Sequence, residues 1–435
     1  MLSFAPPELL VSHPALTKMN TALLRTVILL SLTIACKLAT AGPQTSTAGP
    51  APSDTAMDMN MMMREPGFHL YGWVETGITG NFDSPNDRQN FGRLFDDRSN
   101  EPLLNQFILT AERIPDPKAG FDWGFKGQFL YGSDARYLHS TGLLDLTTTD
   151  TVQPDITEAW VLTHFPITNT ANGLDLKLGK YGTSIGEEMT DPSMNAFYSH
   201  SYIFNFGAPF NATGLLATLY AQTWLDVSAG LTRGVNVTFD DPNDSVSFYG
   251  GAVVRCCKDK LCCAAMVHAG PENPNDNHNY RYLSDFTLTW KPNDRFTAIT
   301  DVNYAYEEAF DARGYGVAQY FTYALNDCCS IGTRLEVWRD EEGFFVAQFA
   351  SNNDFIHFER GDDTAFDPRT VGGGRTTYGA VTVGLTIKPH VPKPLTGLMI
   401  RPELRYDSSL NNTHPFNDSQ DSHMLTAGVD AIISF

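Results

Sequence analysis

Hydrophobic and polar residues alternate with a period of two along most of the chain after Phe68. In the C-terminal stretch MLTAGVDAIISF the apolar residues on one side are Leu425, Ala427, Val429, Ala431, Ile433 and Phe435. Residues 121–132, 295–307 and 399–407 repeat the pattern, and no amphipathic helical pattern lies between them. A period of two predicts β-strands that have one apolar and one polar face.

Aromatic residues stand near both ends of several of these apolar faces. Examples are Phe121 and Tyr131, Tyr282 and Trp290, and Phe296 and Tyr306. An apolar band with aromatic residues at both ends is typical of a membrane-crossing strand, because amphipathic rings favour the headgroup level. Strands of about 9–11 residues are long enough to cross. Such a sheet must close, because lipid offers no hydrogen-bond partner to a free edge.

The connections between the predicted strands alternate in length. Short turns are expected at 115–120, 257–261, 291–295 and 326–328. Long polar loops are expected at 80–101, 132–154, 182–213, 270–279, 307–313, 340–376 and 407–421. Short periplasmic turns and long extracellular loops predict an all-β, transmembrane antiparallel up-and-down β-barrel of about 16 strands. The last strand would close it against a first strand at 68–79, and a soluble β-propeller or sandwich is the alternative.

Composition narrows the function classes. The chain has 435 residues, a formal net charge of −20 and only 18% charged residues. The acidic balance argues against nucleic acid as a partner, because phosphate binding requires clustered Lys and Arg. No G-x-S-x-G motif occurs, and His200 lies in a predicted loop. We therefore expect neither an enzyme nor a cofactor.

The first part of the chain predicts export. Within residues 1–41, for which Met19 is the better initiator, Arg25 precedes an apolar run, and Ala-Thr-Ala follows at 39–41. These are the features of a secretory signal peptide. Residues 42–66 are rich in Pro, Ser, Thr and Met and predict a disordered linker. The predicted barrel, 67–435, would be integral to the outer membrane of a diderm bacterium.

Two stretches carry a resemblance to a known family. LDLKLGKYGTSIGEEM (174–189) and NAFYSHSYIFNFGAPFNATGLLATL (195–219) resemble the outer-membrane β-barrel porin family of the OmpL-like group. The resemblance extends over most of 68–435 and implies a barrel in a membrane. The terminal Phe435 likewise resembles the signal that outer-membrane proteins present to the barrel assembly machinery.

The polar strand faces would line a lumen, and loop 182–213 would narrow it. This loop is unusually aromatic, so we expect it to fold back into the barrel, with the wall residues Arg401 and Arg405 opposite its acidic side chains. The expected pore-lining and constriction residues are Glu187, Glu188, Asp191, Lys177, Arg281, Asp285, Arg334, Glu336, Arg401, Glu403 and Arg405. Two alternatives stay open: a loop that caps the outside, and a lumen plugged by its own charge pairs.

Six cysteines remain after the predicted cleavage. They are Cys256, Cys257, Cys262, Cys263, Cys328 and Cys329. In a hairpin that turns at residues 258–261, Cys257 would face Cys262 and Cys256 would face Cys263. An exported protein meets an oxidising compartment, so disulfides are plausible, whereas a zinc site would require all four thiolates on one face.

These features together predict a porin that admits small hydrophilic solutes by passive diffusion, with a mild preference for cations. The expected partners are outer-membrane lipid, the barrel assembly machinery and those solutes. Porins of this size are often trimers, but no interface can be read from the sequence, so a homo-oligomer stays open. The rival function is a non-conducting barrel that anchors the envelope or binds a partner through its loops.

Overall fold

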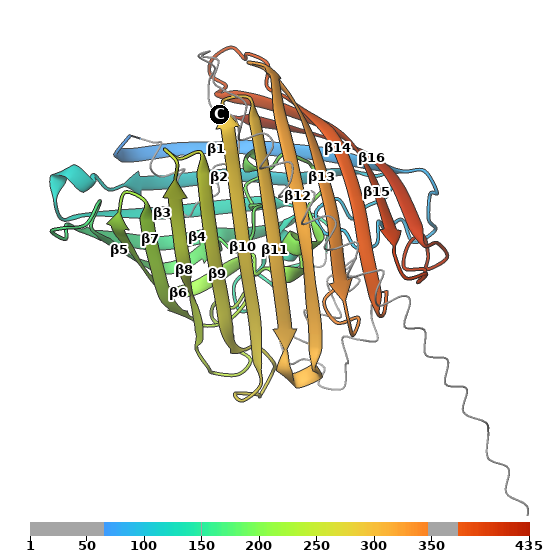
Figure 1. Ribbon diagram of the computed structural model, residues 1–435, viewed down its shortest axis with the longest axis horizontal. Coiled ribbons are helices and arrows are strands. Elements are labelled where there is room, and N and C mark those ends of the chain that lie inside the picture. Colours follow the sequence, from blue (N-terminus) through green and yellow to red (C-terminus); the bar gives the residue numbers. More distant parts are fainter. Residues whose placement is uncertain (1–64, 149, 347–372) are drawn as a thin grey trace, which may run out of the picture. The chain divides into compact units, whose positions relative to one another are not determined.

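The computed structural model describes residues 65–148, 150–346 and 373–435. The strands of these residues form a closed antiparallel barrel in which each strand pairs with its neighbours in sequence (Figure 1). They are β1 (Gly67–Asn81), β2 (Pro102–Ile114), β3 (Asp122–Gly132), β4 (Gln153–Phe165), β5 (Leu174–Gly182), β6 (Asn211–Gln222), β7 (Leu225–Thr232), β8 (Ser247–Cys256), β9 (Leu261–Pro271), β10 (Tyr280–Asn293), β11 (Phe296–Glu307), β12 (Ala312–Asn326), β13 (Cys329–Asp340), β14 (Thr376–Ile387), β15 (Gly397–Ser409) and β16 (His423–Ser434). The predicted barrel of 16 strands is confirmed for the described residues.

The last strand closes the cylinder against the first. In the β1–β16 register Val74 pairs with Ile433, and the backbones of Gly72 and Phe435 exchange two hydrogen bonds of 3.0 and 3.1 Å. A Cβ atom on Gly72 would lie 2.9 Å from the Phe435 ring and 2.2 Å from the Ile108 carbonyl oxygen. Glycine at position 72 therefore leaves room for the terminal ring.

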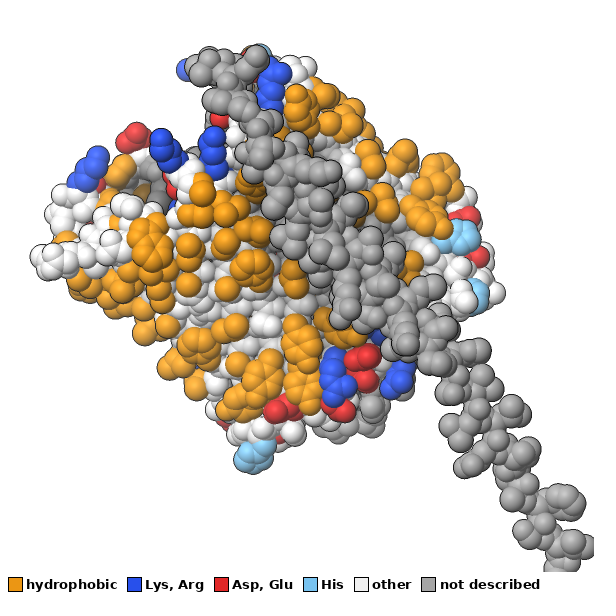
Figure 2. Space-filling view, viewed as in Figure 1, with side chains coloured by type: hydrophobic (Ala, Val, Ile, Leu, Met, Phe, Trp, Pro, Cys, Tyr) orange, Lys and Arg blue, Asp and Glu red, His pale blue; other side chains and the backbone are white. Residues whose placement is uncertain are grey.

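Polar and apolar faces alternate through the wall as the sequence predicts. On β15, Leu404 and Tyr406 are 56% and 44% exposed, whereas Arg401 and Arg405 are 1% and 0% exposed. Figure 2 shows hydrophobic side chains spread over the outer face of the barrel, with charged side chains toward its ends. An apolar belt of this extent would be costly in water and suits lipid.

The connections differ in length between the two ends of the barrel. Those between β6 and β7, β8 and β9, β10 and β11, and β12 and β13 span two to four residues. Most connections at the other end are longer, and they carry the short helices α3 (Ala135–Leu138), η2 (Pro192–Met194) and η3 (Ile203–Gly207). The β11–β12 connection, predicted as a long loop, has only four residues and contains η4 (Glu308–Phe310). One long connection, 233–246, was missed by the sequence pattern, and η1 (Pro117–Ala119) lies at the short-turn end.

The predicted signal peptide, and the predicted linker as far as residue 64, lie outside the described residues, so both stay predictions. Most of the predicted loop 340–376 lies outside them as well. No helix in the part of the chain that the structure describes is long and apolar enough to cross a membrane.

Candidate functional site

The connection between β5 and β6, residues 183–210, runs inside the barrel and is called the inner loop here. Its Ser184 amide donates to the hydroxyl of Tyr249 on β8 at 2.8 Å. Its Tyr202 hydroxyl donates to Asp407 on β15 at 3.1 Å, and its Tyr198 hydroxyl donates to Asn105 on β2 at 3.1 Å. Contacts with three separated strands require the loop to lie across the lumen. The predicted inward fold is therefore confirmed.

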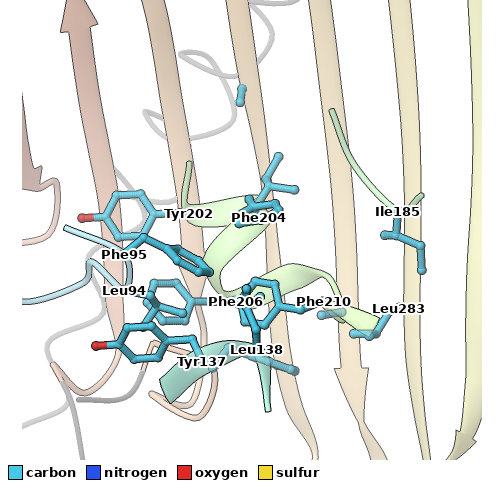
Figure 3. Close-up of a cluster of buried hydrophobic side chains, with 14 of the residues drawn as sticks. Leu94, Phe95, Tyr137, Leu138, Ile185, Tyr202, Phe204, Phe206, Phe210 and Leu283 are labelled. Carbon is cyan, nitrogen blue, oxygen red and sulfur yellow. The ribbon is translucent and has the colours of Figure 1, made fainter. Parts of the chain in front are cut away.

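Aromatic packing explains why the inner loop folds into the barrel instead of extending into the solvent outside it. Phe204 and Phe210 pack around Phe95, with ring centroids 5.7 and 5.5 Å away (Figure 3). Tyr137 of α3 closes the same cluster at 5.5 Å from Phe95. Phe95 and Tyr137 belong to two other long loops, so three loops share one buried cluster inside the barrel. The sequence pattern predicted those two loops to be polar, although their apolar pairs Leu94-Phe95 and Tyr137-Leu138 indicate the buried contacts.

Arg334 of β13 anchors the loop through Glu188. Its guanidinium lies 2.7 Å from the Glu188 carboxylate and also donates to the Ser199 carbonyl oxygen at 2.6 Å. Glu188 further accepts hydrogen bonds from the Tyr320 hydroxyl and the Ser201 amide, at 2.9 and 3.0 Å.

Burial by itself would raise the pKa of Glu188. The Arg334 charge, His200, whose Nδ1 is 2.8 Å away, and the Ser201 amide outweigh burial and hold this pKa at about 2. The carboxylate is therefore charged and fully engaged.

Arg401 and Arg405 do not face the loop carboxylates, contrary to the sequence-based expectation. Arg401 donates to the carbonyl oxygens of Pro192 and Asn195 at 2.7 and 3.0 Å, and Arg405 donates to that of His200 at 2.5 Å. Their carboxylate partners stand on the wall itself, with Asp430 2.5 Å from Arg401 and Asp407 2.8 Å from Arg405. Spacing along one strand could not show that the arginines would bind backbone.

Glutamates alternate with these arginines and hold the amide groups of the loop. Glu403 accepts from the amides of Tyr198 and Ser199, at 2.9 and 3.2 Å. Glu336 accepts from the amide of Tyr202 at 2.8 Å. Arginine therefore binds carbonyl oxygens and glutamate binds amides, so β13 and β15 together satisfy a buried irregular backbone that would otherwise be costly.

The other predicted loop acids have different surroundings. Asp191 accepts hydrogen bonds from the amide and hydroxyl of Ser193, at 2.9 and 2.7 Å, and so caps η2. Glu187 is half-buried, and its amide donates to Asp301 of β11 at 3.1 Å. Asp285 of β10 lies beside Asp301.

The wall formed by β2–β8 carries charge pairs that water still reaches; it is called the exposed wall here. Two pairs of this wall, Lys180–Asp155 and His164–Asp175, are buried. Three pairs are partly exposed: Arg113–Asp122, Lys126–Glu158 and Arg255–Asp226, with nitrogen–oxygen distances of 3.0, 2.6 and 2.7 Å. These side chains are 11–30% exposed, whereas the side chains of Arg334 and Glu188 are 0% and 4% exposed.

The two remaining predicted pore residues also point inward. Lys177 of β5 lies 4.8 Å from the centre of the Trp160 ring. Arg281 of β10 forms a buried ion pair of 2.8 Å with Glu307.

The cysteine hairpin has a different register from the one predicted. The β8–β9 turn is Cys257–Lys260, so Cys256 pairs with Leu261 and Val254 pairs with Cys263. The expected facing pairs are therefore wrong: the partner of Cys256 is two residues earlier in the chain than predicted. Cys257, Lys258 and Asp259 adopt φ values of 58–61°, which the sequence did not indicate for residues other than glycine. No disulfide links the cysteines that the structure describes.

A closed barrel of sixteen strands with an inner loop bound to its wall has the architecture of a porin. A family model described as "Putative beta-barrel porin-2, OmpL-like" matches residues 67–435. The chain belongs to this family of outer-membrane β-barrels. No curated protein gave a match.

Solved structures share the barrel at low sequence identity. OprB of Pseudomonas putida has a TM-score of 0.52 and 14% identity, over 85% of this chain and 94% of its own. The outer membrane channel DcaP of Acinetobacter baumannii has a TM-score of 0.52 and 12% identity, over 85% and 97%. An anion-selective porin from Comamonas acidovorans has a TM-score of 0.52 and 10% identity, over 85% and 100%. At such identities the likeness establishes the fold alone.

Proposed function

We propose that this barrel is a passive outer-membrane channel for small hydrophilic solutes, with a mild preference for cations. The observation that carries the proposal is the asymmetry of the lumen. Arg334, Arg401 and Arg405 bind the part of the inner loop that lies against β13 and β15. Three ion pairs of the exposed wall remain partly accessible to water. Sixteen strands enclose enough space for an aqueous path beside such a loop.

The cation preference is expected from the charges that remain without a countercharge. Arg401, Arg405 and Arg334 all have carboxylate partners, so they contribute little net positive potential. Asp285 and Asp301 have no Lys or Arg within 4 Å in the part of the chain that the structure describes. A net negative lumen concentrates cations. One structural neighbour is described as an anion-selective porin, so the proposed cation preference rests on the lumen side chains of this chain and not on its fold.

Planar-bilayer recording tests the channel. Purified, folded protein should produce discrete conductance steps in KCl, and a KCl gradient should give a reversal potential with the sign for cations. The rival function, a non-conducting anchor or loop-mediated binding protein, is favoured if folded protein inserts without opening channels. Folding is checked by heat-modifiable migration in SDS gels, so a silent bilayer can be assigned to a closed barrel rather than to misfolding.

Recognition of Phe435 by the barrel assembly machinery and assembly into a homo-oligomer belong to the same proposal. The proposed signal role of Phe435 is supported by its position where β1 and β16 meet, because its backbone hydrogen-bonds to Gly72 there. A Phe435→Ser variant that refolds in detergent but fails to reach the outer membrane in cells would support its role as a signal. Sedimentation in detergent would give the oligomeric state.

A further inference from the structure

Two carboxylates, those of Asp285 and Asp301, lie buried side by side where the inner loop passes over β10 and β11. Asp285 pairs in register with Asn303, and Asp301 pairs with Thr287, so both aspartates point inward from neighbouring strands. Their carboxyl groups are close enough to influence each other. The inner loop lies directly on them, since a Cβ atom on Gly186 would be 3.7 Å from Asp301 and 4.0 Å from Asp285.

This pair has acceptors in excess of donors. Asp301 is 1% exposed; its Oδ2 accepts the Glu187 amide at 3.1 Å, and its Oδ1 has no hydrogen-bond donor among the described residues. Asp285 Oδ2 accepts from the side-chain amide of Asn303 at 3.2 Å. The Asn303 Oδ1 atom, on a side chain that is 2% exposed, also has no donor in the described part of the chain. Buried oxygens without donors are expensive unless something positive binds them.

Several other inward carboxylates have a basic partner, and Glu403, which has none within 4 Å among the described residues, accepts two loop amides instead. Glu188, Asp407 and Asp430 each have an arginine within 2.8 Å, and Glu307 has Arg281 at 2.8 Å. Asp285 and Asp301 have no such partner within 4 Å among the residues that the structure describes. Two buried carboxylates close together repel each other, and a bound cation or a shared proton must relieve that repulsion.

We infer that Asp285 and Asp301 bind a hard divalent cation, with Ca²⁺ as the best fit, at the edge of the inner loop. Carboxylate oxygens are the ligands that such cations prefer, and Ca²⁺ accepts an irregular shell that includes water. The neighbouring Glu187 is half-buried, and its backbone amide donates to Asp301 at 3.1 Å.

The protein supplies two carboxylate ligands at this site, and water molecules would complete the coordination shell of the ion. Among the described residues, no group of three or more His, Cys, Asp or Glu side chains has metal-holding geometry. A site of this kind should bind Ca²⁺ weakly, with a dissociation constant of about 10⁻⁴–10⁻³ M. The bound ion would join β10, β11 and the inner loop, and it would do so whether or not the barrel conducts.

Calcium binding to the refolded, full-length mature barrel tests the inference without any need for conductance. Isothermal titration with CaCl₂ should give about one site per chain. The double variant Asp285→Asn/Asp301→Asn should lose at least about tenfold in affinity. Asp226→Asn, which removes one carboxylate from the exposed wall, is the matched control and should bind as the original protein does. Heat-modifiable migration verifies that each variant is folded.

Two outcomes would overturn the inference. Folded protein that binds no Ca²⁺ at about 10 mM, well above the expected range, would assign the aspartate pair to a shared proton. Equal Ca²⁺ binding by all three proteins would place the ion elsewhere on the acidic surface. A barrel that binds Ca²⁺ at this pair and yet never conducts would contradict only the proposed channel.

Discussion

Arg334 on the barrel wall and Glu188 on the inner loop form a 2.7 Å ion pair between side chains that are 0% and 4% exposed. They are 146 residues apart in the sequence. Arg334 also donates to the carbonyl oxygen and the hydroxyl of Ser199, at 2.6 and 3.1 Å. This arginine therefore binds the inner loop at two places, Glu188 and Ser199.

Loss of this arginine should release the inner loop. Arg334→Met leaves Glu188 buried without a countercharge, so we expect a loss of about 3–5 kcal/mol in the free energy of unfolding. A released loop should also make single-channel conductance larger or noisier. Arg255→Met is the matched control, because it breaks a pair that is 16% and 11% exposed and should cost about 1 kcal/mol or less. Urea unfolding in lipid vesicles measures both, and equal losses would show that Arg334 has no special anchoring role.

Acid should weaken the same contact only well below neutral pH. The pKa of Glu188 is lowered to about 2, so its charge adds stability above its ordinary pKa of about 4.3. That stability is lost as the pH falls from about 4 toward 2, and amounts to about 3 kcal/mol. The unfolding free-energy gap between the original protein and Glu188→Gln should thus be constant from pH 8 to 5 and shrink below pH 4. A gap that already closes between pH 7 and 5 would contradict this assignment.

Barrel closure should depend on the absence of a side chain at position 72. Gly72→Val places atoms against the Phe435 ring and the Ile108 carbonyl oxygen, so we expect a loss of about 1–3 kcal/mol or failure to fold. Gly127→Val is the control, because a Cβ atom there meets nothing within 4 Å. Heat-modifiable migration after refolding compares the two, and a fully folded Gly72→Val barrel would place the terminal ring elsewhere.

Disulfides, where they form, should stay within each of the two cysteine groups, residues 256–263 and residues 328–329. Cys256 and Cys263 are near neighbours across β8 and β9, but β10 and β11 separate them from Cys328 and Cys329. Strands are about 4.8 Å apart, so β9 and β12 are about 14 Å apart along the wall, beyond the reach of a disulfide. Non-reducing peptide mapping of protein isolated from the envelope should find links only within residues 256–263 or between Cys328 and Cys329. A link between the two groups would contradict the strand order.

Local patterns predicted much of this structure, whereas the pairing of distant groups escaped them. Alternation is a property of single strands, so it gave the strand number, the lumen face and the closure by Phe435. The inward fold of the inner loop was also predicted from a local property, the aromatic content of residues 197–210. The partner of Glu188 could not be predicted, because it depends on where a loop crosses a strand 146 residues later. The predicted cysteine register was wrong because of one turn, in which three consecutive residues other than glycine have φ near 60°.

Ion selectivity should follow the aspartates that have no arginine rather than the loop acids that are already engaged. Asp285→Asn/Asp301→Asn removes the negative charge of a carboxyl pair that has no Lys or Arg within 4 Å among the described residues, so in a KCl gradient without divalent cations the reversal potential should move toward anions. Asp191→Asn should leave it nearly unchanged, since that carboxylate caps η2 through Ser193. Glu188→Gln also leaves Arg334 without its loop partner, so a shift there would mix charge with loop movement. A reversal potential that is the same in the original protein and the double aspartate variant, with conductance intact, would show that the permeating ions pass along the exposed wall beyond the influence of these two carboxylates.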